Sequence, residues 1–478
     1  MMQLISWQFA LFVLALFLIY NIVPSSWQKG LLLVASFGLI SVWSPAGVGV
    51  ILISILVNYY IGQRIWDKDQ KRAGTLRFGI VFNIGLIILI RILTSKVDIT
   101  PILNGLFHAK GIDLSWLLPV GYLFYTLQAI SYLVDIGQKT IKPALSLLDF
   151  ALYMAYFPRI ISGPIERARD FLPQLQVARV VDGDMLQRAF VRILTGLFRK
   201  IVIANALASY LPDNLFIQPY QFNSFQLIFG LIVYSFWIYN DFAGYTDIVR
   251  GVSGLFGIEL SANFKTPYLA TGFTDFWNRW HISLSHWLRD YIYYPLSRSL
   301  LRKKISPKSL IYIAVPPIVT MLVSGLWHAF GAYMLAWGLL HGLYQAAEKF
   351  FALHFAAKFN SINKILTRTI QILLIYLGVT LAWLPFTSGS LSRVLSYVRA
   401  ISTSQVTVSI DTMLIPPLYA ILLTIVLDFL EYEANHELQQ IRLSSVIKYG
   451  LTIFAGISLL LSLINQQNLL GGFIYAGF

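Results

Sequence analysis

Long apolar runs separated by short polar stretches occupy most of the chain. A helix needs about 20 apolar residues to cross a bilayer. The runs predict membrane-spanning helices at 4–23, 30–46, 47–63, 78–95, 114–136, 224–242, 310–328, 331–348, 369–386, 412–430 and 447–465. A further helix is expected near 186–210, although Arg199 and Lys200 interrupt its apolar pattern. The pattern therefore predicts an all-α polytopic membrane protein with about 11 to 12 transmembrane helices.

Basic residues in the polar stretches predict how these helices are oriented. Residues 64–77 contain five Lys and Arg side chains, and loops rich in these residues stay in the cytoplasm. Counting spans outward from this loop places the N-terminus outside. The segments 137–184 and 243–309 then lie inside, and the segments 94–113 and 387–411 lie outside.

Two aromatic intervals, Tyr156–Leu175 and Tyr239–Leu296, do not fit a simple bundle of spans. Both contain too many polar, Gly and Pro residues for a span, and too many aromatic residues for ordinary solvent loops. Irregular backbone at membrane depth is stable only where protein or a water-filled cavity satisfies its polar groups. We therefore expect short re-entrant or interfacial helices around a cavity that opens to the cytoplasm.

The composition supports a single membrane-embedded domain. Hydrophobic residues make up 57% of the 478 residues and charged residues 12%, with a mean hydropathy of +0.67. A soluble protein of this length needs more charge on its surface. We expect one domain over 1–478, with peripheral N-terminal helices at 1–113 and a core at 114–478. Since the chain has no cysteine, disulfides, thiolate metal sites and a cysteine nucleophile are excluded.

The net charge of +14 is compatible with nucleic-acid binding when taken by itself. The basic residues, however, lie in short loops between apolar runs. This distribution fixes membrane orientation and contacts anionic lipids. We therefore expect membrane lipids, and no nucleic acid, as partners.

A histidine ends one of the predicted spans. His328 follows Trp327 at the end of 310–328, and ionisable residues within spans are rare and usually functional. An imidazole is also the side chain best suited to act as a general base near neutral pH. The alternative is a structural histidine that forms a hydrogen bond between helices.

A second histidine lies in the motif FWNRWHISLSHWLRDY. If this motif is helical, His281 and His286 are about 140° apart around the helix and do not share a face. No carboxylate completes a ligand set, so we expect no metal there. An amphipathic interfacial helix explains Trp277, Trp280 and Trp287.

The remaining polar motifs have structural explanations. The other histidines, His341 among them, are interpreted as structural or loop residues. Asp241 and Asp247 are compatible with paired acid–base carboxylates, but capping and a turn around Gly244 explain them as well. The chain contains no phosphate-binding loop, dinucleotide fingerprint or nucleophile elbow, so ATP-driven transport, dinucleotide chemistry and hydrolase chemistry have no support.

Four motifs, in order along the chain, carry a resemblance to a known family. They read YFPRIISGPIERARDF, YNDFAGYTDIVRGVSGLFGIELSANFKTPYL, FWNRWHISLSHWLRDYIYYPL and SGLWHAFGAYMLAWGLLHG. Together they resemble the membrane-bound O-acyltransferase family. They are most similar to its bacterial branch, with alginate O-acetylase and the D-alanyl transfer protein of teichoic acid modification. The similarity runs from about Trp116 to the C-terminus, where GGFIYAGF also resembles this branch.

The resemblance implies both a fold and an active site. The implied fold is a ring of transmembrane helices with a thin centre, crossed by a tunnel where a cytoplasmic acyl donor meets an extracytoplasmic hydroxyl. The family's essential histidine matches His328, and its second polar position, Asn or His, matches His281. His328 would then accept the hydroxyl proton, and His281 would form a hydrogen bond to the donor carbonyl or hold the thioester end of the donor in place. Trp327 and Asn278 are further substrate-binding candidates.

The implied reaction is acyl transfer without an acyl-enzyme, and we expect no bound cofactor or metal. The donor is expected to be acetyl-coenzyme A or an acyl carrier protein thioester. Arg302, Lys303 and Lys304 are candidates for docking this anionic donor; alternatively, they only fix the topology. We expect a multi-pass protein of the inner (plasma) membrane.

The acceptor and the acyl group stay open at this point. Acetyl transfer to a polysaccharide or peptidoglycan, completed by an exported esterase-like partner, is the first expectation, and D-alanyl transfer to teichoic acid is the second. Alginate-type members continue with PLGGNR where this chain reads PLSRSLLRKK. A transporter is a third alternative, but its ionisable residues usually lie in several spans. A non-catalytic scaffold would tolerate the loss of both histidines.

Overall fold

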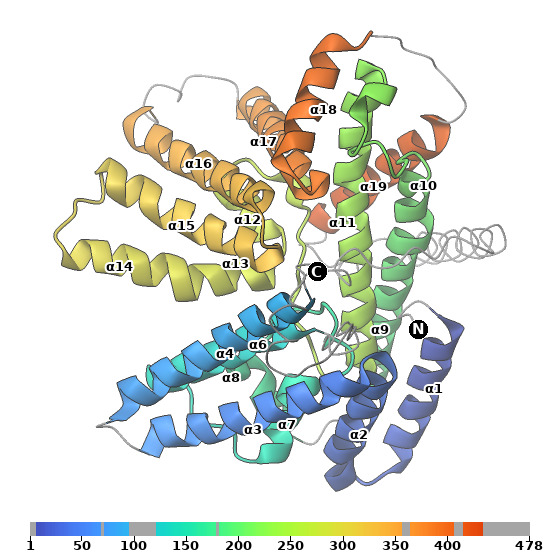
Figure 1. Cartoon of the computed structure of the whole chain (residues 1–478). Helices are drawn as coiled ribbons and strands as arrows, with labels where there is room; N and C mark the ends of the chain where they lie inside the picture. Colours follow the sequence, from blue (N-terminus) through green and yellow to red (C-terminus); the bar gives the residue numbers. More distant parts are fainter. Residues whose placement is uncertain are drawn as a thin grey trace, which may run out of the picture. The chain divides into compact units, whose positions relative to one another are not determined.

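The computed structural model describes residues 6–67, 71–94, 121–177, 181–355, 364–405 and 414–433. Every regular element within these residues is helical (Figure 1). The chain divides into two compact units. Unit 1 comprises Met1–Phe190 and Val249–Ser261, and unit 2 comprises Val191–Ile248 and Ala262–Phe478.

Unit 1 is built from helices of the N-terminal part of the chain. They are α1 (Trp7–Ile22), α2 (Ser25–Trp43), α3 (Pro45–Asp67), α4 (Arg72–Thr94), α6 (Tyr122–Gly137), α7 (Leu147–Ala155), α8 (Ala168–Phe171), η3 (Leu172–Leu175) and the first part of α9 (Gly183–Leu197). The side chains of α6 are buried along almost its whole length. This helix therefore forms the centre of the unit.

The aromatic interval Tyr156–Leu175 lies in unit 1 and contains only short helical pieces, as predicted. One of its buried charged side chains, Glu166, has hydrogen-bond partners within the unit. Glu166 is buried and accepts hydrogen bonds from the backbone nitrogen and the hydroxyl of Ser261, at 2.6 and 3.0 Å. Burial raises the pKa of Glu166, although these hydrogen bonds oppose the shift. The interval is a packed part of the unit.

Unit 2 contains the rest of α9 and most of α11 (Ser224–Leu255), followed by short and long helices. The remaining elements are η4 (Phe198–Ala204), α10 (Asn205–Ala208), η5 (Pro219–Gln221), η6 (Pro267–Leu269), α12 (Phe273–Arg279), α13 (Ile282–Leu288), η7 (Arg289–Tyr293), α14 (Tyr294–Arg302), α15 (Leu310–His328), α16 (Ala332–Phe355), α17 (Lys364–Ser388), α18 (Leu391–Thr403) and α19 (Ile415–Glu433). The helix expected near 186–210 is present, because α9, the π-helical η4 and α10 follow one another without a break.

The structure decides two points that the sequence left open in the interval Tyr239–Leu296. Helix α11 continues to Leu255, so Gly244 lies inside a helix and not in a turn. A Cβ added to Gly244 would lie 2.7 Å from the carbonyl oxygen of Gly196. The glycine therefore permits a close helix crossing. The second point is the motif around His281, which is not one helix: α12 has ended before His281 and α13 begins after it, so no single helix relates His281 to His286.

Six helices of the described residues are long and apolar enough to cross a membrane. They are Pro45–Asp67, Arg72–Ile92, Ser224–Leu255, Leu310–His328, Ile365–Ser388 and Ile415–Tyr432. Helix α1 is a shorter apolar helix. Helices α2, α6 and α16 overlap further predicted spans and are not among the six, and the predicted span 447–465 lies outside the described residues. The described residues thus contain six candidate spans by length and composition, where about 11 to 12 are predicted for the whole chain.

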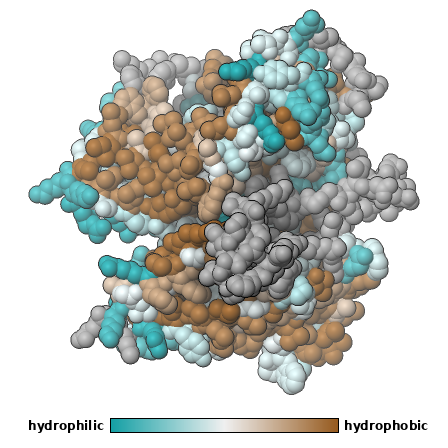
Figure 2. Space-filling view, in the orientation of Figure 1, coloured by the Kyte–Doolittle hydropathy of each residue, from teal (hydrophilic) through white to brown (hydrophobic). Residues whose placement is uncertain are grey.

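Exposed apolar side chains gather on the outside of each unit. Figure 2 shows brown, apolar surface over α15 and α16 and, separately, over α3 and α4. Leu339 and Leu343 on α16 are more than 40% exposed, as are Leu52 and Ile53 on α3. Exposed apolar area of this extent is expected where lipid is the solvent. The prediction of an all-α polytopic membrane protein is confirmed.

The predicted boundary between peripheral helices and core, at 113/114, lies outside the described residues. The single domain over 1–478 therefore stays a prediction. The ring of transmembrane helices and the tunnel that crosses it also stay predictions.

Candidate active site

Helices α15 and α16 approach each other closely, and this places His328. A Cβ added to Gly325 would lie 2.3 Å from the carbonyl oxygen of Met334, and one added to Gly338 would lie 2.3 Å from that of Met321. Small residues allow such close packing of helix backbones in membranes. The glycine spacing in the sequence therefore fixes the end of α15, and with it His328, against α16.

His328 is the last residue of α15 and is enclosed by aromatic rings. Its side chain is 3% exposed. Its ring centroid lies 4.8 Å from that of Trp327, 5.4 Å from that of Trp337 and 5.3 Å from that of Phe386. These rings come from α15, α16 and α17, so the imidazole is held at the meeting point of three helices.

His281 lies between α12 and α13 in a left-handed backbone conformation, with φ 42° and ψ 53°. The neighbouring backbone is held by Asn263, whose carbonyl oxygen accepts from the Ile282 nitrogen at 3.0 Å and whose side chain accepts from the Ser283 hydroxyl at 2.6 Å. The His281 ring packs on Phe242 at 4.8 Å. Its position is therefore fixed from α11, from α13 and from the segment before α12.

Burial determines the charge of His281. The side chain is 1% exposed, and desolvation lowers the pKa of its imidazole to about 3, because the charged form loses more by leaving water than the neutral form. The imidazole is therefore neutral at physiological pH. A neutral imidazole has one N–H donor and one acceptor nitrogen.

The two predicted catalytic histidines both pack against the side chain of Trp327. Trp327 is buried, and its ring lies 6.2 Å from that of His281 and 4.8 Å from that of His328, centroid to centroid. The fold thus brings together three of the predicted site residues, although 46 positions separate His281 from Trp327.

The other predicted site residues lie elsewhere in unit 2. Asn278 is exposed on α12 and accepts a hydrogen bond from Arg289 at 3.4 Å. Arg302, Lys303 and Lys304 are exposed at the end of α14 and in the turn that follows it. Their roles in substrate binding and donor docking stay predictions.

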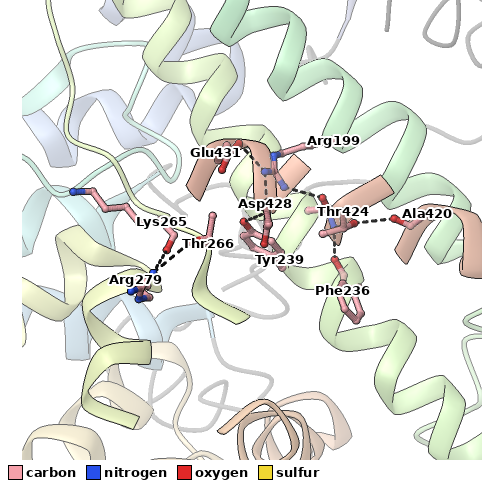
Figure 3. Close-up of polar contacts among 11 residues, drawn as sticks. Arg199, Phe236, Tyr239, Lys265, Thr266, Arg279, Ala420, Thr424, Asp428 and Glu431 are labelled. Atoms are coloured by element: carbon pink, nitrogen blue, oxygen red, sulfur yellow. Dashed lines mark hydrogen bonds and ion pairs between the residues drawn. The ribbon is translucent and has the colours of Figure 1, made fainter. Parts of the chain in front are cut away.

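The break between α12 and α13 is anchored on the α12 side. Arg279, the last residue of α12, donates from its guanidinium to the Lys265 carbonyl oxygen at 3.5 Å and to the Thr266 hydroxyl at 3.4 Å (Figure 3). It also donates to Asp275 at 2.7 Å. These contacts hold the end of α12, two positions before His281.

A buried ionic network on η4, α11 and α19 was not predicted as such. The Arg199 guanidinium donates to Asn240 at 3.1 Å, to Asp428 at 3.1 Å and to Glu431 at 2.8 Å (Figure 3). The Tyr239 hydroxyl donates to Asp428 at 2.8 Å. The sequence contained one signal for this network, because Arg199 and its acidic partners lie in separate apolar runs and charges within a membrane usually pair.

No metal cluster occurs in the part of the chain that the structure describes, where no three His, Cys, Asp or Glu side chains are close enough to hold an ion. The chemistry visible at the site is that of two buried imidazoles among aromatic rings. Such a pair can accept a proton at one ring and donate a hydrogen bond from the other.

Comparison with known proteins places this site in a family. The family described as membrane-bound O-acyltransferase matches residues 34–386, which include His281 and His328. The match begins well before Trp116, where the resemblance of the motifs begins. The closing GGFIYAGF lies beyond the match and outside the described residues.

Individual relatives agree with the family match. A protein named "Probable alginate O-acetylase AlgI" from Azotobacter vinelandii is 30% identical over 393 residues, which cover 80% of this chain and 74% of that protein. A "Peptidoglycan O-acetyltransferase" from Helicobacter pylori is 28% identical over 405 residues, or 79% and 73% of the two chains. A "Teichoic acid D-alanyltransferase" from Streptococcus thermophilus is 30% identical over 298 residues, or 61% and 69%.

The names of these relatives share one kind of chemistry, the transfer of an acyl group. The candidate membrane spans and the family match over residues 34–386 agree with a membrane-bound member of this family. The chain belongs to the membrane-bound O-acyltransferase family and is a multi-pass membrane enzyme that transfers acyl groups.

Proposed function

We propose that this enzyme moves an acyl group, in the first place acetyl, from a cytoplasmic thioester donor to an extracytoplasmic hydroxyl. The hydroxyl belongs to a polysaccharide or cell-wall polymer, or to an exported partner that completes the transfer. The observation that carries the proposal is the shared ring contact of His281 and His328 with Trp327. It supports a base and a hydrogen-bond donor acting on one reacting group.

His328 is the general base of the proposed reaction. It accepts the hydroxyl proton while the hydroxyl oxygen forms a bond to the thioester carbonyl carbon. The C–S bond then breaks, and the leaving thiolate takes the proton from the His328 imidazolium. Such general-base assistance typically contributes about 10²–10⁴-fold. No acyl-enzyme is needed.

His281 stabilises the carbonyl oxygen in this proposal. The oxygen gains negative charge as the hydroxyl attacks, and a preorganised hydrogen-bond donor stabilises it most in the transition state. The neutral imidazole already has one N–H group, so it can donate a hydrogen bond to this oxygen without being protonated. Holding the donor and the acceptor beside both histidines lowers the barrier further.

The donor docks on basic residues that precede α15. Arg302, Lys303 and Lys304 are exposed, and a donor with a phosphopantetheine arm is anionic. Electrostatic steering acts mainly on association and is screened by salt. Neutralising all three is therefore expected to raise the KM for the donor at low ionic strength, with little change in kcat. Donor kinetics in inverted vesicles at two salt concentrations test this, and an unchanged KM would leave the three residues as a topology signal.

D-alanyl transfer is the second candidate function. It is favoured by the relative named "Teichoic acid D-alanyltransferase", which is as similar in identity as the alginate relative, although over a shorter length. The two functions differ in the donor. Acetyl transfer uses acetyl-coenzyme A or an acetyl carrier, and D-alanyl transfer uses a carrier protein loaded with D-alanine.

The proposed function is tested in inverted inner-membrane vesicles from cells that contain the native acceptor. Radiolabelled acetyl-coenzyme A and a D-alanyl carrier protein are supplied separately, and label is measured in polymer and in exported protein. His328→Ala is expected to abolish labelling with normal insertion. The matched control is His354→Ala, which removes an exposed histidine of α16 and should leave labelling unchanged.

Each outcome of this assay bears on a separate part of the proposal. Labelling from one donor only identifies the acyl group. Absence of label from both donors in the wild type would overturn the proposed function. Substantial labelling by His328→Ala would overturn the general-base role of His328.

A further inference from the structure

Three buried aromatic side chains form a group beside His328 that the proposed mechanism does not use. We call Trp277 on α12 and Trp337 and His341 on α16 the ring triad. Their ring centroids are 5.8 Å apart for Trp277 and Trp337, 5.0 Å for Trp277 and His341, and 5.0 Å for Trp337 and His341. The three side chains are 7%, 1% and 0% exposed, in the same order of residues. Each ring therefore contacts the other two away from the surface.

The polar atoms of the ring triad have no partners among the described residues. Neither nitrogen of His341 forms a hydrogen bond there, and the same holds for the indole nitrogens of Trp277 and Trp337. Buried polar atoms in native proteins almost always have a partner. The triad offers three N–H donors and one acceptor nitrogen. A ligand group that both donates and accepts hydrogen bonds, such as an amide, would pair with these donors and this acceptor.

The ring triad is held firmly against the candidate active site. Trp337 packs on His328 at 5.4 Å, so one ring joins the triad to the proposed base. Helix α12 is tied to α16 because the backbone nitrogen and the hydroxyl of Thr274 both donate to Glu348, at 2.8 Å each. The triad and His328 therefore belong to one packed assembly of α12, α15 and α16.

The direction of α16 places His341 on the donor side of His328. A Cβ on Gly325 would contact Met334, and one on Gly342 would contact Ile318, so α15 and α16 run antiparallel. His341 lies four residues beyond Trp337, or about 6 Å along the helix axis, toward the end where α15 begins. The exposed basic residues proposed to dock the donor precede α15. A donor that enters from that end reaches His341 before it reaches His328.

We propose that the ring triad binds the cysteamine amide of the donor's phosphopantetheine arm while His328 faces its thioester. This inference rests on the proposed function. The amide carbonyl accepts from the indole N–H groups, and the amide N–H donates to the acceptor nitrogen of His341. Only the sulfur, two methylene carbons and the amide nitrogen separate the thioester carbonyl carbon from the amide carbonyl carbon. The two histidines are correspondingly close, because the Trp337 ring packs on both His328 and His341. Coenzyme A and acyl carrier proteins share this arm, so the assignment is independent of the acyl group.

The test measures binding of two unreactive probes to the purified full-length protein by calorimetry. One probe is S-ethyl phosphopantetheine, a thioether. The other is its isostere with an ester oxygen in place of the cysteamine amide N–H. The wild type is expected to bind the amide probe at least about tenfold more tightly, since a buried acceptor left unpaired weakens binding by this order. Equal affinities, or no binding of either probe, would overturn the assignment.

Variants separate this role from a purely structural one. His341→Leu removes the acceptor nitrogen and should abolish the preference for the amide probe. His341→Gln has an amide oxygen as acceptor and should retain much of it. Trp337→Phe should weaken the binding of both probes equally, because both contain the carbonyl that accepts from the indole N–H. Trp43→Phe, which also removes a buried tryptophan but in unit 1, should change nothing. A preference that survives in a folded His341→Leu protein would contradict the inference.

Failure of the inference and failure of the proposed function give different results. Probe binding requires no acceptor and no turnover. A wild type that labels polymer but does not distinguish the probes would refute the ring triad's role alone. A wild type that distinguishes the probes but labels nothing from either donor would refute the proposed function and leave the binding site in place.

Discussion

His281 has a backbone conformation that few residue types adopt. Non-glycine residues with φ near 42° are uncommon, and Asn, Asp and His are enriched among them. The side chain at this position is also buried against Phe242 and Trp327. The position therefore selects a polar residue that tolerates the left-handed region and can donate a hydrogen bond.

Substitutions of His281 distinguish these two requirements. His281→Asn keeps a hydrogen-bond donor and tolerates the backbone, so we expect near-normal thermal stability and partial transfer activity. His281→Ala loses the donor and is less compatible with positive φ, so we expect a loss in kcat of about 10²-fold or more together with a lower Tm. Transfer assays and thermal unfolding of both variants check this. Wild-type activity in His281→Ala would remove His281 from the mechanism.

Residue-level prediction succeeded in part because motifs identify positions but not contacts. His281, Trp327 and His328 were predicted together, and the structure places them in ring contact. His341 was interpreted as a structural or loop residue, because the sequence does not show that two tryptophan rings pack on it or that its nitrogens have no hydrogen-bond partner among the described residues. A turn around Gly244 was one explanation for Asp241 and Asp247, because the sequence does not show that Gly244 packs against Gly196 on a separate helix.

At the scale of elements, charged residues gave the least reliable signal. Arg199 and Lys200 interrupt the apolar pattern of the helix expected near 186–210, yet both are buried in a continuous helical segment. Lys200 forms an ion pair with Asp241 on α11, and Arg199 pairs with Asp428 and Glu431 on α19. The partners lie up to 232 positions away in the sequence. Apolar periodicity along one segment contains no information about such distant compensation.

Removing Arg199 should destabilise the assembly of η4, α11 and α19. Arg199→Met leaves the Asp428 and Glu431 carboxylates without their cation, and breaking a buried pair in this way costs about 3–5 kcal/mol. We expect a clear fall in the thermal unfolding midpoint in detergent. Arg298→Met is the matched control, because Arg298 is exposed on α14 and surface substitutions change stability by about 0.5 kcal/mol or less.

A double variant separates the ionic network from simple loss of packing. Arg199→Met combined with Asp428→Asn removes charge of both signs, so it should be more stable than the sum of the two single effects predicts. Additive effects would mean that Arg199 acts through packing, for example through its contact over the Tyr239 ring at 5.2 Å, and not through its charge.

At the scale of the whole molecule, the composition and the apolar runs identified the fold class. The spans at 310–328 and 369–386 correspond to α15 and α17, and the span at 224–242 belongs to a helix that continues to Leu255. The orientation of the spans was derived from loop charge, which is a property of insertion and not of internal packing. The orientation is therefore tested by labelling from the two sides of the membrane.

The topology is the last prediction, and the absence of cysteine from the chain makes it directly testable. Single cysteines at Lys71, Lys303, Asn104 and Ser390 are exposed to an impermeant maleimide on intact cells, or on spheroplasts where an outer membrane is present. Cysteines at Lys71 and Lys303 should be protected because their loops are basic. Those at Asn104, which lies outside the described residues, and at Ser390 should label. Permeabilised cells, in which all four should label, control for accessibility. Labelling at Lys303 from outside would invert the second half of the chain, put Arg302 and its neighbours on the acceptor side, and refute entry of the donor from the cytoplasm.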